Sequence, residues 1–331
     1  MRILLAVLFF CSTLMDGAMA YNPVNGLGMP TLPFTMEGDV KVFKLRAEPV
    51  VTRFCSMEKI CKSNLTWGYN GVTPGPVIEA VEGDKIRIEF TNGLQMHTAV
   101  HWHGLELPNA MDGGGMHTQR LVQPGETFNY EFTLEQSGTF LYHSGHMQSL
   151  QVGMGQAGFF IAHPKKEEHP VDHDYLMMLQ IWSIPPHDQI PDTMSMEFNW
   201  FTINGKVGPD VPHLRAMSGE KIRVRIANLS MMSHPIHLHG HTFWIVEDGG
   251  GRNPESAHTR ANTISLSAGE SKTVEFHASK HPGPWLFHCH FLHHIMNDMD
   301  RPPVPGEKMI MAKEAGMFTV LDVESGSAEK K

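Results

Sequence analysis

The sequence consists of two copies of one pattern, and this repeat constrains the fold more than any other feature. A segment of the form Gly-acid-Lys-Ile-Arg begins at Gly83 and again at Gly219, and each copy leads eighteen residues later to His-X-His-Gly, at His101 and His237. A second pattern, aromatic-Leu-aromatic-His, follows in each copy and ends at His143 and His288. Two matched landmarks in one order predict two copies of a single domain.

Each copy is expected to form a β-sandwich. Residues 85–90 and 221–226 alternate polar and apolar side chains, and Gly and Pro separate the short runs. A chain of 331 residues with 41% hydrophobic residues can form two cores of ordinary size. We therefore predict an all-β chain with two Greek-key sandwich domains in tandem, at 36–165 and 170–322, joined near 163–174 and carrying functional loops at the sandwich ends.

Charge and hydropathy exclude several classes of protein. The net charge is −9 and no basic run occurs, so nucleic acid is not an expected partner. Residues 1–20 have a basic start, a short apolar stretch and a small-residue end, which predicts a signal peptide cleaved before Tyr21 and export to a periplasm or the outside. No later stretch reaches about 18 uncharged apolar residues, which argues against a membrane-embedded protein.

The four cysteines bear on the cellular compartment. Cys11 lies within the predicted signal peptide. Cys55 and Cys61 are close in sequence and could pair in an oxidising compartment, and the sequence leaves this disulfide open. Cys289 then stays single, between two histidines.

Histidine and methionine are unusually frequent, with 22 and 23 residues. Imidazole and thioether are side chains that suit copper. In an extended strand, His-X-His places both imidazoles on one face, so neighbouring pairs predict a multi-metal site. The clusters are His101 with His103, His143 with His146, the run from His234 to His241, and the run from His288 to His294.

With these motifs the sequence resembles the multicopper oxidases over nearly all of the predicted mature chain. The motifs are HWHG at 101–104, HPIHLHGH at 234–241 and HCH at 288–290. The resemblance implies cupredoxin-like domains and about four copper ions per chain, one of type 1, one of type 2 and two of type 3. It also implies that a donor is oxidised one electron at a time while a trinuclear cluster reduces O2 to water. A copper nitrite reductase is a poorer match, because the paired His-X-His motifs favour a trinuclear site.

The resemblance assigns the type 1 copper to the second domain. Its expected ligands are His234, Cys289 and His294, the His2Cys set of a blue-copper site with a weak axial thioether. The axial ligand is open between Met299, at the usual family spacing and slightly favoured, and Met317, in a segment that resembles the family's closing loop.

The family's ligands for the trinuclear cluster are nearly complete. The eighth ligand is expected two residues after His143, where the chain has Gly145. We predict that a local bulge brings His146 into this place; without it, one type 3 copper would lack a ligand and oxygen reduction would be impaired. The implied ligands are His101 and His237 for type 2, and His103, His143, His146, His239, His288 and His290 for type 3.

Neighbouring residues complete the implied mechanism. Cys289 is bonded on both sides to a cluster histidine, so electrons can pass through bonds from the type 1 copper to the cluster. Ser144 has the corresponding position in the first copy, so blue copper is expected in the second domain alone. Asp112 resembles the family's proton-relaying carboxylate, although Asp-Gly is also a common turn pair. His293 departs from relatives that carry an acid at this place.

The assembly and the electron donor follow from the same resemblance. Two-domain relatives build the cluster between neighbouring subunits in a ring of three, so a homotrimer is expected. Methionines near the type 1 end favour cuprous ion as the donor and a role in copper resistance, and phenols of the laccase kind are an equal alternative. A non-catalytic copper-sequestering protein is a further alternative, which Gly145 also supports. The methionines are Met231, Met232, Met296, Met299, Met309, Met311 and Met317.

Overall fold

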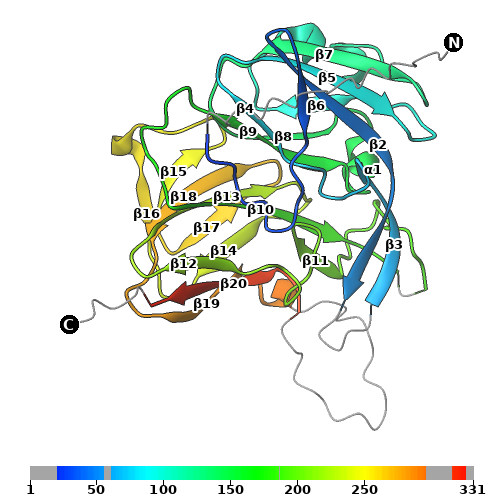
Figure 1. The fold of residues 1–331 in the computed structure, drawn as a ribbon. Coiled ribbons are helices and arrows are strands. Elements are labelled where there is room, and N and C mark those ends of the chain that lie inside the picture. The colour runs from blue at the N-terminus through cyan, green and yellow to red at the C-terminus, as the bar shows by residue number, and fades with distance from the viewer. Residues whose placement is uncertain (1–20, 56–60, 186, 296–314, 326–331) are drawn as a thin grey trace, which may run out of the picture.

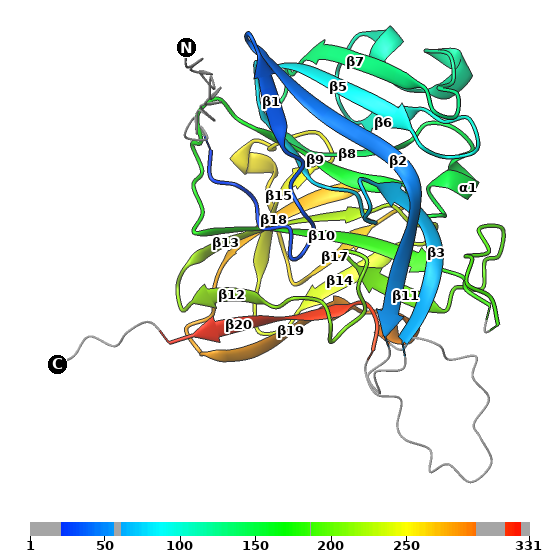
Figure 2. The same cartoon turned by 45° about the vertical axis from the view of Figure 1, so that its right-hand side comes forward.

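The computed structural model describes residues 21–55, 61–185, 187–295 and 315–325, and β-strands dominate them (Figure 1, Figure 2). The strands form four sheets, two from each copy of the repeat. The all-β fold of two sandwiches is thus confirmed. The predicted signal peptide lies outside the described residues.

The first half consists of two sheets around one core, which contains the buried Trp102 and Phe43. One sheet has the order β1 (Phe34–Glu37), β2 (Val40–Cys55), β5 (Lys85–Asn92) and β7 (Thr127–Thr133), with β3 (Cys61–Tyr69) also paired to β2. The other has the order β4 (Ile78–Val81), β9 (Ala157–His163), β8 (Gly138–Ser144) and β6 (Val100–His103).

The second half repeats this plan around a separate core, which contains Phe243 and Cys289. One sheet has the order β11 (Trp200–Ile203), β10 (His173–Trp182), β13 (Lys221–Asn228), β18 (Ser271–His277), β15 (Phe243–Asp248) and β16 (Thr259–Ala261). The other has the order β12 (Leu214–Met217), β20 (Phe318–Glu324), β19 (Gly283–Cys289), β14 (His234–Leu238) and β17 (Thr263–Leu266).

Equivalent strands pair in the same way in both halves. β2 runs parallel to β5 as β10 does to β13, and β4 runs parallel to β9 as β12 does to β20. β6 pairs with β8 so that His101 lies opposite His143, and β14 pairs with β19 so that His237 lies opposite His288. The repeat in the sequence therefore places the histidine motifs on matching strand ends.

Helices are short in the described residues. They are α1 (Gln148–Gln151) and the 3-10 turns η1 (Asn109–Met111), η2 (Gly115–His117), η3 (Glu255–Ala257) and η4 (Leu292–Ile295). Among these described helices, none has the length and apolar character needed to cross a membrane.

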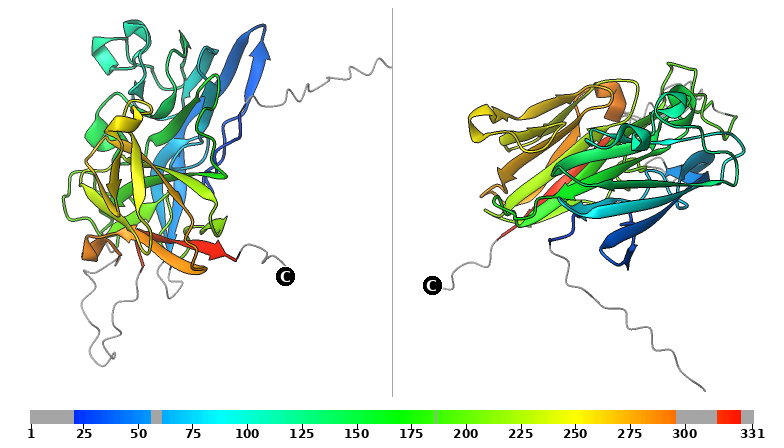
Figure 3. Two further views of the ribbon diagram at one scale, coloured as in Figure 1. Left: turned by 90° about the vertical axis from the view of Figure 1, so that its left-hand side faces the viewer. Right: turned by 90° about the horizontal axis from the view of Figure 1, so that it is seen from above.

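Apolar contacts join the two halves, which lie side by side (Figure 3). One cluster contains Leu141 and Phe159 of the first half and Leu176 and Met178 of the second. The end of β2 also reaches the second half, where Phe54 packs on two tryptophans. These contacts fix the halves as one body.

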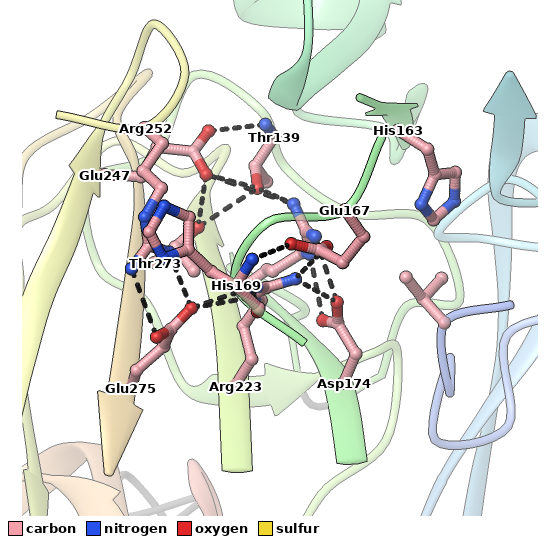
Figure 4. Close-up of polar contacts among 12 residues, drawn as sticks. Thr139, His163, Glu167, His169, Asp174, Arg223, Glu247, Arg252, Thr273 and Glu275 are labelled. Carbon is pink, nitrogen blue, oxygen red and sulfur yellow. Dashed lines mark hydrogen bonds and ion pairs between the residues drawn. The ribbon is translucent and has the colours of Figure 1, made fainter. Parts of the chain in front are cut away.

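A buried polar network lies beside the apolar contacts (Figure 4). Glu247 of β15 accepts hydrogen bonds from the backbone N–H and the hydroxyl of Thr139 in β8. Arg225 of β13 donates to the Thr139 hydroxyl at 2.8 Å and pairs with Asp174 at 2.9 Å. Because β8 also carries His143, the network holds a histidine-bearing strand of the first half against the second half.

Candidate metal centre

Three side chains of the second half meet at one point. His234 begins β14, Cys289 ends β19 and His294 lies in η4, and all three are buried. Cys289 Sγ lies 3.3 Å from His294 Nδ1 and 3.8 Å from His234 Nδ1, and the two nitrogens are 3.1 Å apart. Two imidazole nitrogens and a sulfur therefore face one position, which fits the donor set of copper in electron-transfer sites.

Burial sets the protonation of this group. It lowers the pKa of His234 to about 4 and that of His294 to about 3, with a further contribution from neighbouring imidazoles. Burial raises the pKa of the Cys289 thiol to about 12. At neutral pH the imidazoles are therefore uncharged and able to bind a metal, whereas the thiol keeps its proton until a cation displaces it.

Two neighbouring side chains orient these imidazoles. Ser230 Oγ lies 2.9 Å from His234 Nε2, and the Phe201 ring stacks on the His294 ring with centroids 4.2 Å apart. Contacts on the far side of an imidazole decide which nitrogen faces a metal. Ser230 thus keeps His234 Nδ1 directed at Cys289, and the stacked Phe201 ring holds the plane of the His294 ring.

A second group lies at the end of the first sandwich. The ligand atoms of His101, His103 and His143 lie within 4.8 Å of one another, and His103 Nδ1 is 3.2 Å from His143 Nε2. Burial lowers the pKa of His143 to about 4 and also lowers that of His103, so both rings are neutral at pH 7. Asp112 contacts His101 Nδ1 through its carbonyl oxygen at 2.8 Å and its Oδ1 at 3.4 Å.

A third group lies on β14 and β19, beyond Cys289. His239 Nε2 is 3.1 Å from His288 Nε2, and the His237 ring lies 5.6 Å from the His290 ring. The carbonyl oxygen of Asn262 lies 2.7 Å from His237 Nδ1, which leaves Nε2 of that ring for a metal. His239 and His290 are exposed in the single chain.

The histidines of the two halves stay apart. Within the described ranges, no set of three ligand atoms within 4.8 Å of one another combines the first-half group with the group beyond Cys289. Beside the first-half group lies a cavity of about 570 Å³, whose wall includes Ser230, Trp182 and Phe198. The described residues of one chain thus hold two separate histidine groups, the first-half group and the group beyond Cys289, which we call half-sites.

The comparisons decide the family. Residues 54–167 and 181–304 each match a family model described as multicopper oxidase. The chain belongs to the multicopper oxidase family. The blue copper oxidase of Nitrosomonas europaea is a similar solved structure, with 29% identity, a TM-score of 0.71 and 85% of each chain covered.

Curated relatives match over shorter stretches. An L-ascorbate oxidase of Cucurbita pepo var. melopepo is 38% identical over 37% of this chain and 23% of its own length. Copper resistance protein A of Escherichia coli is 28% identical over 57% of this chain and 30% of its own length. The chain thus spans less than a third of each of these two relatives.

Gly145 stands where the resemblance led us to expect an eighth copper ligand. A Cβ there would clash with the carbonyl oxygen of Gly113, so the loop after Asp112 fills the space of a side chain at this position. His146 lies outside the group of His101, His103 and His143, so the structure does not bring the predicted replacement into that group. No bulge that would redirect it is found where β6 pairs with β8.

The two candidate axial methionines differ in what the structure describes. Met317 is fully buried in the core that contains Cys289. Its carbonyl oxygen accepts from the Cys289 N–H at 3.0 Å, and its N–H donates to the His294 carbonyl at 2.8 Å. Met299 lies outside the described residues.

Sequence reasoning missed several contributors to these sites. Ser230 stands four residues before His234, and this spacing is a signal that could have indicated a contact with the ring. Phe201 and Gly113 are distant in sequence from the residues they touch, and no motif marks them. Contacts of this kind depend on how separate loops pack.

Proposed function

We propose that the chain is an oxidase that couples one-electron oxidation of a donor to the four-electron reduction of O2 to water. One observation carries this proposal. Cys289 faces His234 and His294, and its chain neighbour His288 faces His239, because successive residues of a strand point to opposite sides. The strand thus links a one-electron site to a second metal site by a few covalent bonds.

The ligand assignments belong to this proposal. His234, Cys289 and His294 would hold the type 1 copper, His101 and His237 the type 2 copper, and His103, His143, His239, His288 and His290 the type 3 pair. When bound, about four copper ions per chain supply the one-electron steps and the reduction of O2. Met317 would supply the weak thioether ligand, because its backbone is hydrogen-bonded to two of the ligand residues.

Side chains beside the metal groups hold protons and orient the imidazole rings. Asp112 Oδ1 lies beside His101 Nδ1, so this carboxylate can hold a proton within reach of the oxygen-reducing site. Ser230 and Asn262 fix the rings that must bind through their other nitrogens. The thiol proton of Cys289 leaves when copper binds.

Assembly between chains follows from the separation of the half-sites. We propose a homotrimer in which the first-half group of one subunit meets the exposed His239 and His290 of the next. The Cys55–Cys61 disulfide supports export to an oxidising compartment, whether periplasm or exterior.

Two classes of electron donor fit the proposed oxidase. Phenols suit the 570 Å³ cavity, whose wall includes Trp182, Phe198 and Ser230, the residue that contacts His234. The Gln180 Oε1 atom in this wall is buried without a partner in the described structure. Cuprous ion is supported by Met231, which lines the same cavity and follows Ser230 in the chain, and by the likeness to a copper resistance protein.

A second candidate function is copper sequestration without turnover. The blocked position at Gly145 favours it, because one type 3 copper would then lack a protein ligand. Oxygen uptake by copper-loaded protein, with a methoxyphenol or with Cu(I) as donor, separates the two functions. The oxidase predicts uptake that Cys289→Ser abolishes, whereas absence of uptake with both donors supports sequestration.

A further inference from the structure

We propose that the first half carries a surface binding site for cuprous ion, separate from the histidine half-sites. Three loops each bear a methionine next to a histidine, and thioether with imidazole suits Cu(I). The pairs are Met96 with His97, Met116 with His117, and His146 with Met147. This site takes no part in the proposed oxidase reaction, so evidence against the site would leave the oxidase proposal unchanged.

The backbones of the three loops meet at Gly145, which precedes the third pair. The Gly145 N–H donates to the carbonyl oxygen of Ala99 at 2.9 Å, which ties the third loop to the first. Gly115 begins η2, which carries the second pair, and a Cβ at Gly115 would lie 2.7 Å from the Gly145 carbonyl oxygen. The three pairs therefore emerge from one small area.

The side chains share this area. His97, Met116 and His117 line one open groove of about 660 Å³. His146 follows Gly145, whose N–H is hydrogen-bonded to the carbonyl oxygen of Ala99, two residues beyond His97, so the third loop borders this groove. Met116 is 77% exposed and Met147 is 49% exposed, so both side chains are open to an ion from solvent.

Buried polar side chains hold the loops of His97 and His146 in place. The hydroxyls of Thr98 and Ser144 lie 2.7 Å and 2.5 Å from Gln151 Oε1, and all three side chains are fully buried. Gln151 Nε2 donates to the His97 carbonyl oxygen at 2.9 Å, and Ser144 Oγ lies 2.9 Å from the His146 carbonyl oxygen. The backbones that carry both histidines are thus held in place without a metal.

The repeat relates these loops to the loops of the second half that carry the type 1 group. Ser144 has the position of Cys289 in the strand pairing, and Thr98 precedes its His-X-His motif by the same three residues as His234. In the first half, hydrogen-bonding side chains therefore replace the buried copper ligands. The imidazoles lie beside them, on the outer surface of the same loops.

The test is a Cu(I) titration of the copper-loaded full chain, reduced and kept under nitrogen, with bicinchoninate as the competing chelator. We expect one Cu(I) per chain beyond the loaded ions. The double variant Met116→Leu with Met147→Leu should weaken this binding about tenfold or more, because two soft ligands are lost. The matched control, Met194→Leu with Met196→Leu, changes methionines that are 80% and 60% exposed and should bind as the unmodified chain does.

A titration with no additional Cu(I) would overturn the proposal, and so would equal weakening by the control pair. His146→Gln is expected to weaken the additional site and to leave the number of loaded copper ions unchanged. Loss of a loaded ion in that variant would instead place His146 in the type 3 pair and refute the composition of the surface site. Failure of the oxidase proposal is seen separately, as a missing blue absorption band in the unmodified protein.

Discussion

Replacing Glu275 should destabilise the protein in a pH-dependent manner. Its carboxylate pairs with Arg252 at 2.7 Å, Arg223 at 2.8 Å and Lys221 at 3.0 Å. Burial alone would raise the pKa of Glu275, but the three cations outweigh it and lower the pKa to about 2. The charged form is therefore favoured in the folded protein.

The size of the effect follows from this shift. A carboxyl whose pKa falls from 4.5 to about 2 on folding contributes about 3 kcal/mol to the free energy of unfolding. Because the folded pKa is the lower one, this contribution is complete above about pH 4.5 and is lost as the pH falls towards 2. Glu275→Gln is neutral at every pH and should lack it.

Urea denaturation between pH 7 and pH 2 tests this reasoning. The variant should be less stable by about 3 kcal/mol at pH 7, and the difference should shrink as the pH approaches 2. Glu131→Gln is the matched control, because Glu131 pairs with Arg87 at the surface with 54% of its side chain exposed and should contribute less than about 1 kcal/mol. Equal losses in both variants, or a difference that stays constant down to pH 2, would refute the argument.

Three further predictions concern the metal sites. Met317→Leu should shift the blue absorption band and the reduction potential, with a stability loss below about 1.5 kcal/mol. Met299→Leu should shift neither. The reverse pattern would show that Met299, not Met317, is the thioether ligand. Gly145→His should lower stability by about 1–3 kcal/mol without adding copper, since Gly113 fills the space, and a gain of copper on metal analysis would contradict this. Copper binding at the type 1 group of metal-free protein, followed by the blue absorption band, should strengthen about tenfold per pH unit between pH 5 and 8, since Cys289 releases one proton. Equilibrium titrations of this band that show no pH dependence would exclude a protonated thiol.

The sequence was sufficient to predict the strand ends that carry the histidines. The alternation in 85–90 and 221–226 indicates strands, and these residues lie in β5 and β13. The repeated His-X-His motif predicts matching sites, and His101 and His237 do pair with equivalent partners. Such patterns are local in the chain, so periodicity and spacing can identify them.

Contacts between distant segments could not be predicted in this way. The alternation around Arg223 and Arg225 is typical of a strand with one face in solvent, yet both arginines are buried. Arg225 contacts Thr139 of the first half, and Arg223 contacts Glu167 in the segment that joins the halves. The clash at Gly145 depends on how the Gly113 loop packs against β8, which no spacing encodes. Sequence patterns show which side chains share a face but not what covers that face.

The most direct test of the account is the copper content of the purified protein, measured with its subunit mass in solution and its electron paramagnetic resonance spectrum. We predict a trimer with about four copper ions per chain, separate type 1 and type 2 signals and a silent coupled pair. A monomer that holds one copper ion per chain, with a type 1 signal alone, would contradict the proposal that two half-sites join between subunits to reduce O2.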